Sequence, residues 1–182
     1  MNVIKTDIEG IFIVEPQVFG DERGYFFESF NAERFRAETG IEGTFVQDNE
    51  SRSKRGVLRG LHFQRAPYEQ AKLVRVVQGR VLDVAVDIRP ESPTFGKYVA
   101  VELSGENKRQ LFIPKGFAHG YVVLEDDTVF QYKCDEYYHP ECEGGIAWND
   151  PQIGIKWGVS ESDIILSDKD RKHPILKELC EF

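Results

Sequence analysis

Two histidines, a lysine and a tyrosine stand in strand-like stretches, and these side chains can move protons. His62 lies in the glycine-framed stretch Gly56–Gln64, Lys72 and Tyr132 lie in apolar runs, and His119 ends a Pro-x-Gly-x-x-His segment. A neutral imidazole takes a proton near neutral pH, an ammonium group stabilises the resulting anion, and a phenol returns a proton from another side. Together they could invert a carbon beside a carbonyl group, with no redox cofactor.

The spacing Pro114–His119 is typical of the second half of a cupin core, which usually holds a metal ion. A metal-binding core offers His-x-His and a carboxylate in its first half, whereas here Gln64 stands two residues after His62. A three-histidine site would need more imidazoles near the core. The whole chain contains only His62, His119, His139 and His173. We therefore expect proton-transfer chemistry with no metal and no cofactor.

The three cysteines leave one alternative open. Cys134, Cys142 and Cys180 are odd in number and form no Cys-x-x-Cys pair, so a reduced, intracellular setting fits better than a disulfide framework. Cys134, His139 and Cys142 could hold zinc with a fourth ligand. No second cluster of cysteine or histidine stands nearby, so this reading is the less favoured one.

Length and charge limit the class of protein. The 182 residues, 41% of them hydrophobic, suffice for one domain that spans residues 1–182. The net charge of −8 argues against nucleic acid or an anionic membrane as the general partner. A basic stretch, Arg52–Arg55, could face an anionic small ligand or only solvent. The N-terminus has no apolar signal region, and no long apolar run occurs, so we expect a soluble, cytoplasmic protein.

Short runs rich in Val, Ile, Phe and Tyr recur between turn signals, a pattern typical of antiparallel sandwiches and barrels. One amphipathic segment predicts a helix that begins after Asn31 and stops at Gly40. We predict an all-β, cupin-type jelly-roll barrel with short peripheral helices. The expected strands are Ile11–Val14, Tyr25–Phe30, Thr44–Asp48, Lys72–Val77, Val81–Ile88, Tyr98–Leu103, Gln110–Ile113, Tyr121–Leu124 and Thr128–Lys133.

Strand alternation predicts which side chains share an interior. Asp83 and Asp87 fall on one face of the strand Val81–Ile88. In the preceding strand, Lys72–Val77, Lys72 shares a face with Val74 and Val76. Phe130 and Tyr132 share a face, and so do Gln47 and Asn49. If these faces line the barrel, His62, Lys72, His119 and Tyr132 converge at a polar mouth, which is a ligand site.

In several stretches the sequence closely resembles the dTDP-4-dehydrorhamnose 3,5-epimerase family, whose members are cofactor-free sugar-nucleotide epimerases. The resemblance spans nearly the whole chain, in order. The matching stretches are Asp21–Phe26, Phe45–Asn49, Gly56–Gln64, Lys72–Val76, Phe112–Gly120, Tyr132–Cys134 and Leu166–Asp170.

This resemblance implies roles for the proton-transfer residues. It implies His62 as general base, supported by Asp170, and Tyr132 as general acid. It also implies that Lys72 lies at the 4-keto oxygen of the sugar. His119 would lie nearby, oriented by Asp83.

The resemblance also implies a binding site for the nucleotide. Arg23 and Arg59 would lie near the diphosphate, which suits the planar fork of arginine. Strict alternation, however, places Arg59 and His62 on opposite faces of one strand, so both serve one site only if the strand bulges or bends near Gly60. The remaining expected contacts to the base and sugar are Phe26, Glu28, Gln47, Asn49, Glu143 and Lys169.

The motifs leave the outcome of catalysis open. Relatives that invert only one carbon, or shift the ketone along the ring, share the barrel and much of its polar lining. A non-catalytic sugar-binding cupin is a third reading, and it predicts loss of the His62 and Tyr132 pair, which is present here. The resemblance further implies a homodimer that binds a dTDP-sugar, with no nucleic-acid or membrane partner.

Overall fold

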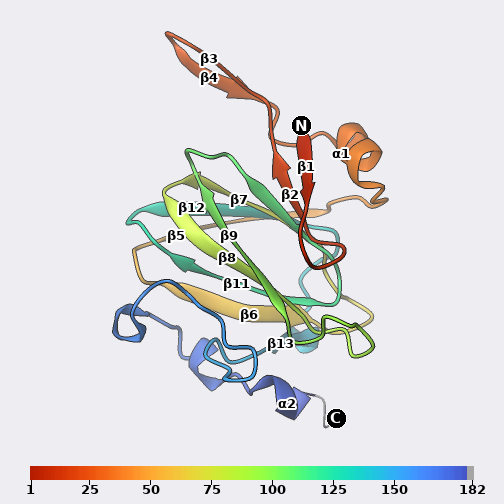
Figure 1. The fold of residues 1–182 in the computed structure, drawn as a ribbon, viewed down its shortest axis with the longest axis vertical. Coiled ribbons are helices and arrows are strands. Elements are labelled where there is room, and N and C mark those ends of the chain that lie inside the picture. Colours follow the sequence, from red (N-terminus) through yellow and green to blue (C-terminus); the bar gives the residue numbers. More distant parts are fainter. Residues whose placement is uncertain (180–182) are drawn as a thin grey trace.

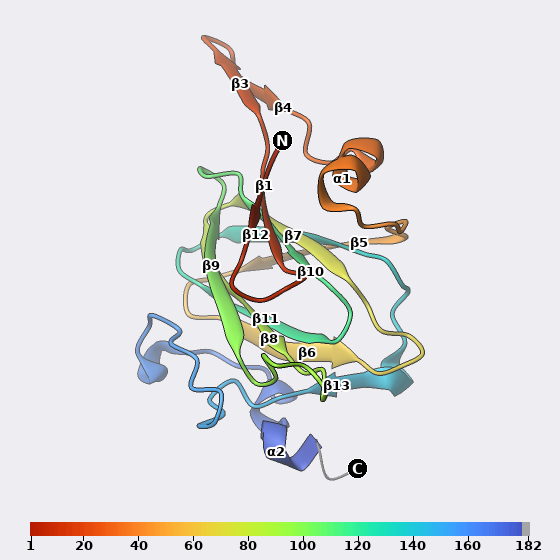
Figure 2. The same cartoon turned by 45° about the vertical axis from the view of Figure 1, so that its right-hand side comes forward.

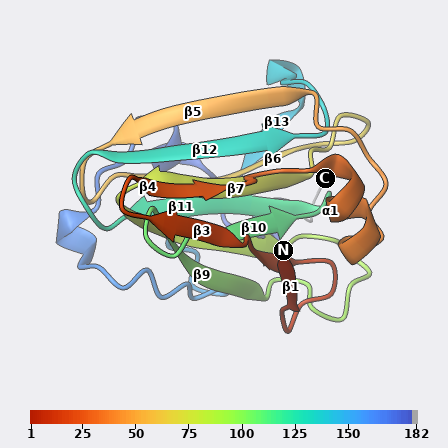
Figure 3. The ribbon, with the colours of Figure 1, turned by 90° about the horizontal axis from the view of Figure 1, so that it is seen from above.

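Two antiparallel sheets form a jelly roll in the computed structural model, which describes residues 1–179 (Figure 1). The six-stranded sheet has the order β1 (Asn2–Lys5), β2 (Phe12–Glu15), β10 (Gln110–Ile113), β7 (Lys72–Gln78), β12 (Thr128–Cys134) and β5 (Gln47–Ser53). The five-stranded sheet has the order β13 (Glu143–Gly145), β6 (Leu58–Gln64), β11 (Phe117–Val123), β8 (Arg80–Asp87) and β9 (Tyr98–Ser104). From above, β5, β12 and β7 lie side by side (Figure 3). The predicted all-β barrel is confirmed.

Alternating side chains from both sheets fill the space between them. Val74, Val76 and Phe130 of the six-stranded sheet pack against Val81 and Ala85 of the other, all at most 2% exposed. Because side chains alternate along a strand, the polar residues in register with these apolar ones also face inward. The predicted interior faces are therefore the real ones, which brings Lys72, Asp83 and Tyr132 into the barrel.

Helices and the C-terminal segment cover the outer faces of the sheets. α1 (Ala32–Thr39) begins after Asn31, whose side chain accepts a hydrogen bond from the Arg34 amide, and ends at Gly40 with φ +70°, as predicted. Phe35 of α1 packs on Leu73 and Phe112 of the six-stranded sheet. The segment after β13 covers the five-stranded sheet. It carries the 3₁₀ helices η2 (Glu161–Asp163) and η3 (Asp170–Lys172), then α2 (Leu176–Leu179), while η1 (Pro140–Cys142) precedes β13.

Two predicted strands were placed wrongly. The predicted strand Thr44–Asp48 overlaps β5 only at Gln47 and Asp48. β5 continues through polar residues to Ser53, because alternate side chains of this strand face solvent. Tyr25–Phe30 is not a core strand. Its first part, β4 (Gly24–Phe27), pairs with β3 (Val18–Asp21) in a separate hairpin that stands away from the barrel (Figures 1 and 2). Aromatic residues there indicated burial, yet Phe26 is 71% exposed.

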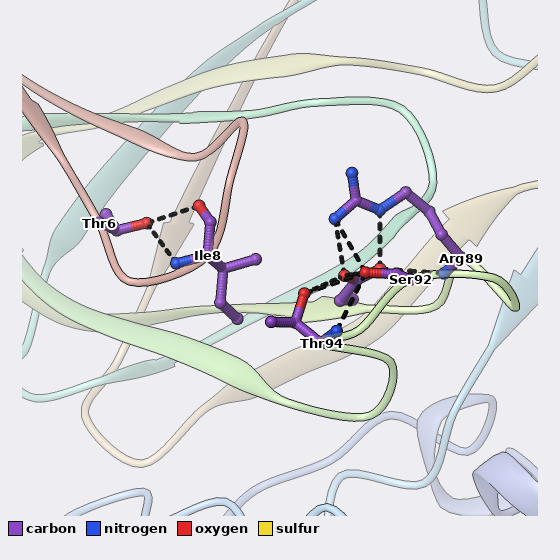
Figure 4. Close-up of polar contacts among 6 residues, drawn as sticks. Thr6, Ile8, Arg89, Ser92 and Thr94 are labelled. Carbon is purple, nitrogen blue, oxygen red and sulfur yellow. Dashed lines mark hydrogen bonds and ion pairs between the residues drawn. The ribbon is translucent and has the colours of Figure 1, made fainter.

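A cluster around Asp87 ties the loop after β8. The fully buried Asp87 carboxylate accepts hydrogen bonds from Arg89 Nε at 2.9 Å, Ser92 Oγ at 2.6 Å and Thr94 Oγ1 at 2.6 Å. Figure 4 shows the Arg89, Ser92 and Thr94 side chains converging there. Burial alone would raise the pKa of Asp87, but these donors outweigh it and hold the pKa far below its usual range. Asp87 therefore shares a strand face with Asp83, but its carboxylate holds the loop after β8 in place.

The structure gives no support for a metal site at the cysteines in the described residues. Cys134 is buried, and the only group of three potential metal ligands found within residues 1–179 is His62, Asp170 and His173, which contains no cysteine. Cys180 lies outside the described residues.

Among residues 1–179, no helix has both the length and the apolar character needed to span a bilayer.

Candidate active site

A cavity of about 520 Å³ opens between the two sheets. One wall is the five-stranded sheet, which contributes His62 and His119, and the facing wall is the six-stranded sheet, which contributes Lys72 and Tyr132. The structure therefore brings the four predicted proton-transfer residues together. The further lining residues are Asn49, Glu50, Ser51, Val57, Leu58, Arg59, Tyr121, Ile165, Leu166, Ser167, Lys169 and Asp170.

His62 forms a close pair with Asp170. Its Nε2 lies 2.6 Å from Asp170 Oδ1, and the Asp170 amide donates to Ser167 Oγ at 3.1 Å, which holds the carboxylate at the start of η3. Burial opposes ionisation of Asp170, but the hydrogen bond and charge of His62 outweigh it and lower the pKa of the carboxyl group. An ionised Asp170 accepts the Nε2 hydrogen, so Nδ1 of the neutral ring is left as the basic atom.

His119 forms a second pair, with Asp83. Its Nε2 lies 2.9 and 3.1 Å from the two oxygens of Asp83, whose side chain is fully buried in the barrel. His119 and His62 are cross-strand partners in β11 and β6. The predicted orientation of His119 by Asp83 is therefore present, and both imidazoles are held at the same wall of the cavity.

Lys72 enters the cavity from β7 without a hydrogen bond or ion pair to any of residues 1–179. Burial lowers its pKa, while nearby Cys134 and Asp83 partly offset this effect. The thiol of Cys134 does not neutralise the ammonium group, because burial raises the pKa of Cys134 to about 11. Lys72 thus presents hydrogen-bond donors that no side chain among residues 1–179 engages, so they are available to a ligand oxygen.

Tyr132 stands on the wall opposite His62. Burial is the main cause that raises its pKa to about 12, and the neighbouring Cys134 and Tyr121 add to it. The phenol therefore keeps its proton at neutral pH. Lys72 Nζ lies 5.8 Å from the centre of the Tyr132 ring, so the proton donor and the cation lie on the same side of the cavity.

Gln64 occupies the position at which a metal-binding cupin has its second histidine, but its side chain is not part of the cavity wall. Its Nε2 donates to the carbonyl oxygens of Tyr68 at 2.6 Å and Tyr137 at 3.1 Å. Its Oε1 accepts from the His139 amide at 2.6 Å. Gln64 thus ties two loops together.

A bulge in β6 brings Arg59 to the same cavity as His62. His62 pairs with His119 and Arg59 pairs with Tyr121, so three steps along β6 oppose two along β11. The extra residue lies at Gly60, with φ +125°, where a side chain would place its Cβ 2.6 Å from the Cα of Gly120. Only glycine fits there. The bulge that the sequence required is present.

Three of the expected binding residues do not reach this cavity. Arg23, Phe26 and Glu28 lie on or just after the β3–β4 hairpin, and none of them is among the residues that line the cavity within the described part of the chain. Arg23 instead pairs with Asp21 on the exposed hairpin. Within one chain these residues do not meet His62, because the strands of the hairpin pair only with each other and the hairpin projects from the barrel.

The remaining expected binding residues lie around the rim. Asn49 lines the cavity, and Gln47 donates to Asn49 Oδ1 at 3.1 Å. Lys169 forms an ion pair with Glu143, which also accepts from Tyr138 Oη at 2.7 Å. Burial alone would raise the pKa of Glu143, but Lys169 and Tyr138 lower it. The rim thus offers both charged groups and amide groups.

Sequence reasoning missed several neighbours of the site. Ser51 and Tyr121 line the cavity and share a hydrogen bond of 2.8 Å, and Tyr121 stacks on Phe130 with 4.0 Å between ring centres. Alternation could have found both, since Ser51 follows Asn49 by two residues and Tyr121 follows His119 by two. No pattern pointed to His173, whose ring lies beside His62 at 5.5 Å between centres.

A jelly roll whose cavity has a histidine on one wall and a protonated tyrosine on the facing wall suits an acid–base isomerase. A family model described as dTDP-4-dehydrorhamnose 3,5-epimerase matches residues 5–178. The chain belongs to this family. It is similar to the dTDP-4-dehydrorhamnose 3,5-epimerase of Escherichia coli, with 59% identity over 98% of this chain and 96% of the relative.

Two solved structures are also similar. A dTDP-6-deoxy-D-glucose-3,5-epimerase from Legionella pneumophila, in complex with dTDP-4-keto-L-rhamnose, matches with TM-score 0.94 and 55% identity, over 97% of this chain and 93% of that one. A 3′-monoepimerase from Streptomyces bikiniensis, in complex with dTDP-quinovose, matches with TM-score 0.90 and 36% identity, over 97% of this chain and 88% of that one.

Proposed function

We propose that the protein converts dTDP-4-dehydro-6-deoxy-D-glucose to dTDP-4-dehydro-L-rhamnose by inverting carbons 3 and 5, in dTDP-L-rhamnose biosynthesis. The observation that carries this proposal is the position of His62 and Tyr132 on facing walls of one cavity. Inversion requires that a proton leave one face of the sugar ring and that another arrive on the opposite face. A base and an acid on facing walls meet that requirement.

His62 acts as the general base. Because Asp170 accepts the Nε2 hydrogen, Nδ1 has a free lone pair and takes the proton from the carbon beside the ketone. The Asp170 carboxylate then stabilises the imidazolium that forms. Asp170 is therefore a positioning and charge-stabilising residue.

Lys72 and His119 stabilise the enolate. When the C–H bond breaks, its electron pair moves toward the 4-keto oxygen, and the amino group of Lys72, which has no hydrogen-bond partner among residues 1–179, donates to that oxygen. His119, held by Asp83, stands on the other wall as a second polar group. The charge is stabilised by groups of the chain itself, so the step needs no cofactor.

Tyr132 acts as the general acid. With its pKa raised to about 12, it remains protonated at neutral pH and delivers its proton to the enolate carbon from the face opposite His62. His62 then loses its proton to solvent and Tyr132 regains one, so the same pair can act on the second carbon. Each inverted carbon exchanges its hydrogen with the solvent.

The protein is proposed to act as a cytoplasmic homodimer. The β3–β4 hairpin exposes Val18, Phe19, Tyr25 and Phe26, from 42% to 71%, and carries nucleotide-binding candidates that miss the cavity of their own chain. A second copy of the chain would cover this apolar surface. In such a dimer, the nucleotide in one cavity is contacted by Arg23, Phe26 and Glu28 of the neighbouring protomer. Its diphosphate is contacted by Arg59 of the protomer that forms the cavity.

Mixed dimers test this arrangement. Neither His62→Ala nor the double variant Arg23→Ala/Glu28→Ala should turn over well alone. If the hairpin serves the neighbouring cavity, a refolded equimolar mixture contains dimers with one complete site, and activity recovers to about a quarter of the wild-type value. Absence of recovery in a mixture shown by sedimentation to be dimeric, or a monomeric protein, contradicts the arrangement.

Proton NMR in heavy water tests the reaction. With dTDP-4-dehydro-6-deoxy-D-glucose, double inversion places deuterium at both carbons 3 and 5. Deuterium at one carbon would instead indicate a single-site epimerase such as the Streptomyces relative, and a shifted ketone would indicate a ketoisomerase. Binding without exchange would indicate a sugar-binding protein. The higher identity to the E. coli and Legionella 3,5-epimerases supports double inversion.

A further inference from the structure

Three potential metal ligands surround the basic residue of the site. The ligand atoms of His62, Asp170 and His173 all lie within 4.8 Å of one another, and within residues 1–179 this is the only such group. Two imidazoles and one carboxylate are a ligand set that suits zinc and other divalent transition metals. The proposed reaction uses only His62 and Asp170, which leaves His173 without a role.

His173 presents a buried nitrogen without a well-aligned hydrogen-bond partner among residues 1–179. Its side chain is 10% exposed, and its buried Nε2 has no hydrogen-bond partner among residues 1–179. That nitrogen lies 3.3 Å from Asp170 Oδ1, which is an ion-pair distance, but the two groups are not aligned as donor and acceptor. A buried polar atom of this kind needs a partner.

The backbone around His173 fixes the position of its ring. Gly145 of β13 pairs with His62 of β6, and the ring of His173 lies against that glycine. A Cβ at position 145 would stand 2.3 Å from the ring atoms. The same strand pair thus positions His62 and, through Gly145, His173, on either side of the Asp170 carboxylate.

Two of the three ligand separations, both to Asp170 Oδ1, are close to those of a zinc site. Zinc binds imidazole nitrogen at about 2.0–2.1 Å and carboxylate oxygen at about 2.0–2.2 Å, so its ligand atoms lie roughly 3.3 Å apart in a tetrahedral site. His173 Nε2 already lies 3.3 Å from Asp170 Oδ1. His62 Nε2, now at 2.6 Å from the same oxygen, has to move outward by less than about 1 Å.

We propose that His62, Asp170 and His173 form a binding site for Zn²⁺ or a similar divalent transition metal, and that occupation of this site inhibits the enzyme. The metal takes the place of the hydrogen between His62 Nε2 and Asp170. The single hydrogen of the neutral His62 ring then resides on Nδ1, the atom that would otherwise accept the substrate proton. The ring is no longer a base, although the cavity remains open to the nucleotide sugar.

Zinc binding and catalytic inhibition are measured separately. Because the diphosphate of the substrate itself binds zinc, calorimetry with Zn²⁺ and visible absorption with Co²⁺ are recorded on the full-length protein without nucleotide. Turnover is measured with a zinc buffer that fixes the free ion concentration, and Mg²⁺, which prefers oxygen ligands, serves as the control ion.

The informative variant is His173→Phe, which keeps a flat ring against Gly145 and removes both ring nitrogens. His173→Gln is a second variant in case the first is poorly folded, and a melting curve checks both. His139→Gln is the matched control, because His139 pairs with the exposed Glu141 and lies outside the group. Inhibition is expressed relative to the metal-free rate of each variant.

We expect one zinc ion per chain and inhibition by Zn²⁺ but not by Mg²⁺. His173→Phe should raise the zinc concentration for half-inhibition, and the calorimetric dissociation constant, by about tenfold or more, whereas His139→Gln should change them less than about twofold. Zinc that binds through His173 without slowing turnover would contradict inhibition and, separately, the role of His62 as base. Equal zinc affinity in wild type and both His173 variants, or no zinc binding, would overturn the site.

Discussion

The two histidine–aspartate pairs consist of the same groups in different settings. His119 and Asp83 lie on adjacent strands of one sheet, with side chains 7% and 0% exposed. The His62 side chain is 30% exposed, and its partner Asp170 comes from the C-terminal segment, 108 residues away in sequence. A base must reach both substrate and solvent, whereas a group that only orients a carbonyl oxygen can remain buried. The difference in exposure thus favours His62 over His119 for the proposed role of the base.

The largest expected effect is that of removing the base. His62→Ala should lower kcat by several orders of magnitude, because the other imidazole on that wall, His119, is buried and held by Asp83, while dTDP should bind almost normally. Turnover and dTDP calorimetry measure the two effects. Loss of nucleotide binding with the chemistry intact would give His62 a different role.

Removing the acid should separate two observable events. Tyr132→Phe keeps the ring and removes only the proton donor, so His62 and Lys72 can still form the enolate. Substrate protons should therefore exchange with heavy water faster than carbons 3 and 5 invert. Inversion at the wild-type rate would contradict the assignment, and a parallel fall of exchange and inversion would place the tyrosine before enolate formation.

Replacing Asp170 by asparagine should lower kcat more than the same replacement of Asp83. An amide in place of Asp170 can donate to His62 Nε2, which moves the ring hydrogen to Nδ1 and disables the base, so kcat should fall by about 10²-fold or more. Asp83→Asn should cost at least about tenfold less, because Lys72 still stabilises the enolate. An equal or larger loss in Asp83→Asn would mean that His119 takes part in proton transfer.

The smallest effect on activity is expected at Asp87, a third buried carboxylate that has arginine, not histidine, as its charged partner. Asp87→Asn should leave kcat within about twofold of wild type but remove charge-assisted bonds of about 2 kcal/mol, which corresponds to a fall in Tm of about 4–8 °C. Melting curves and turnover measure both. A large loss of kcat in a folded variant would contradict a purely structural role.

The stabilisation by Asp87 should depend on pH. Its folded-state pKa lies far below the unfolded value of about 3.9, so its contribution is fully present above about pH 5 and declines as the pH falls further. The difference in Tm between wild type and Asp87→Asn should therefore narrow below about pH 4. A constant difference from pH 7 to pH 3 would show that the carboxylate charge does not contribute.

Local patterns predicted the inward direction of several polar side chains in the barrel. Alternation in β7, β8 and β12 placed Lys72, Asp83 and Tyr132 in the barrel, because a strand that packs one face on a core has only two faces to offer. The same rule showed that Arg59 and His62 could not share a face in a regular strand. Gly60, whose neighbours leave no room for a side chain, lies at the bulge that brings Arg59 and His62 to the same cavity.

Other features depend on contacts that no local pattern encodes. The aromatic residues of β4 looked like core residues, but nothing in their spacing says that β4 pairs only with β3 outside the barrel. The polar β5 was predicted too short, because half of its side chains face solvent. His173 reaches Asp170 only because Gly145 lets its ring approach the β6–β13 pair.

By itself, the sequence determined the class of the fold, the inward faces of its strands and the types of group available for proton transfer, because period-two alternation and side-chain chemistry are local properties. Residue patterns left open which aspartate each histidine contacts, and only the family resemblance implied the two pairs. The tertiary structure alone decided that His62 and Tyr132 face each other from different sheets and that the hairpin with Arg23 lies outside its own cavity. These depend on how distant segments pack, and packing between segments far apart in sequence is set by the whole chain.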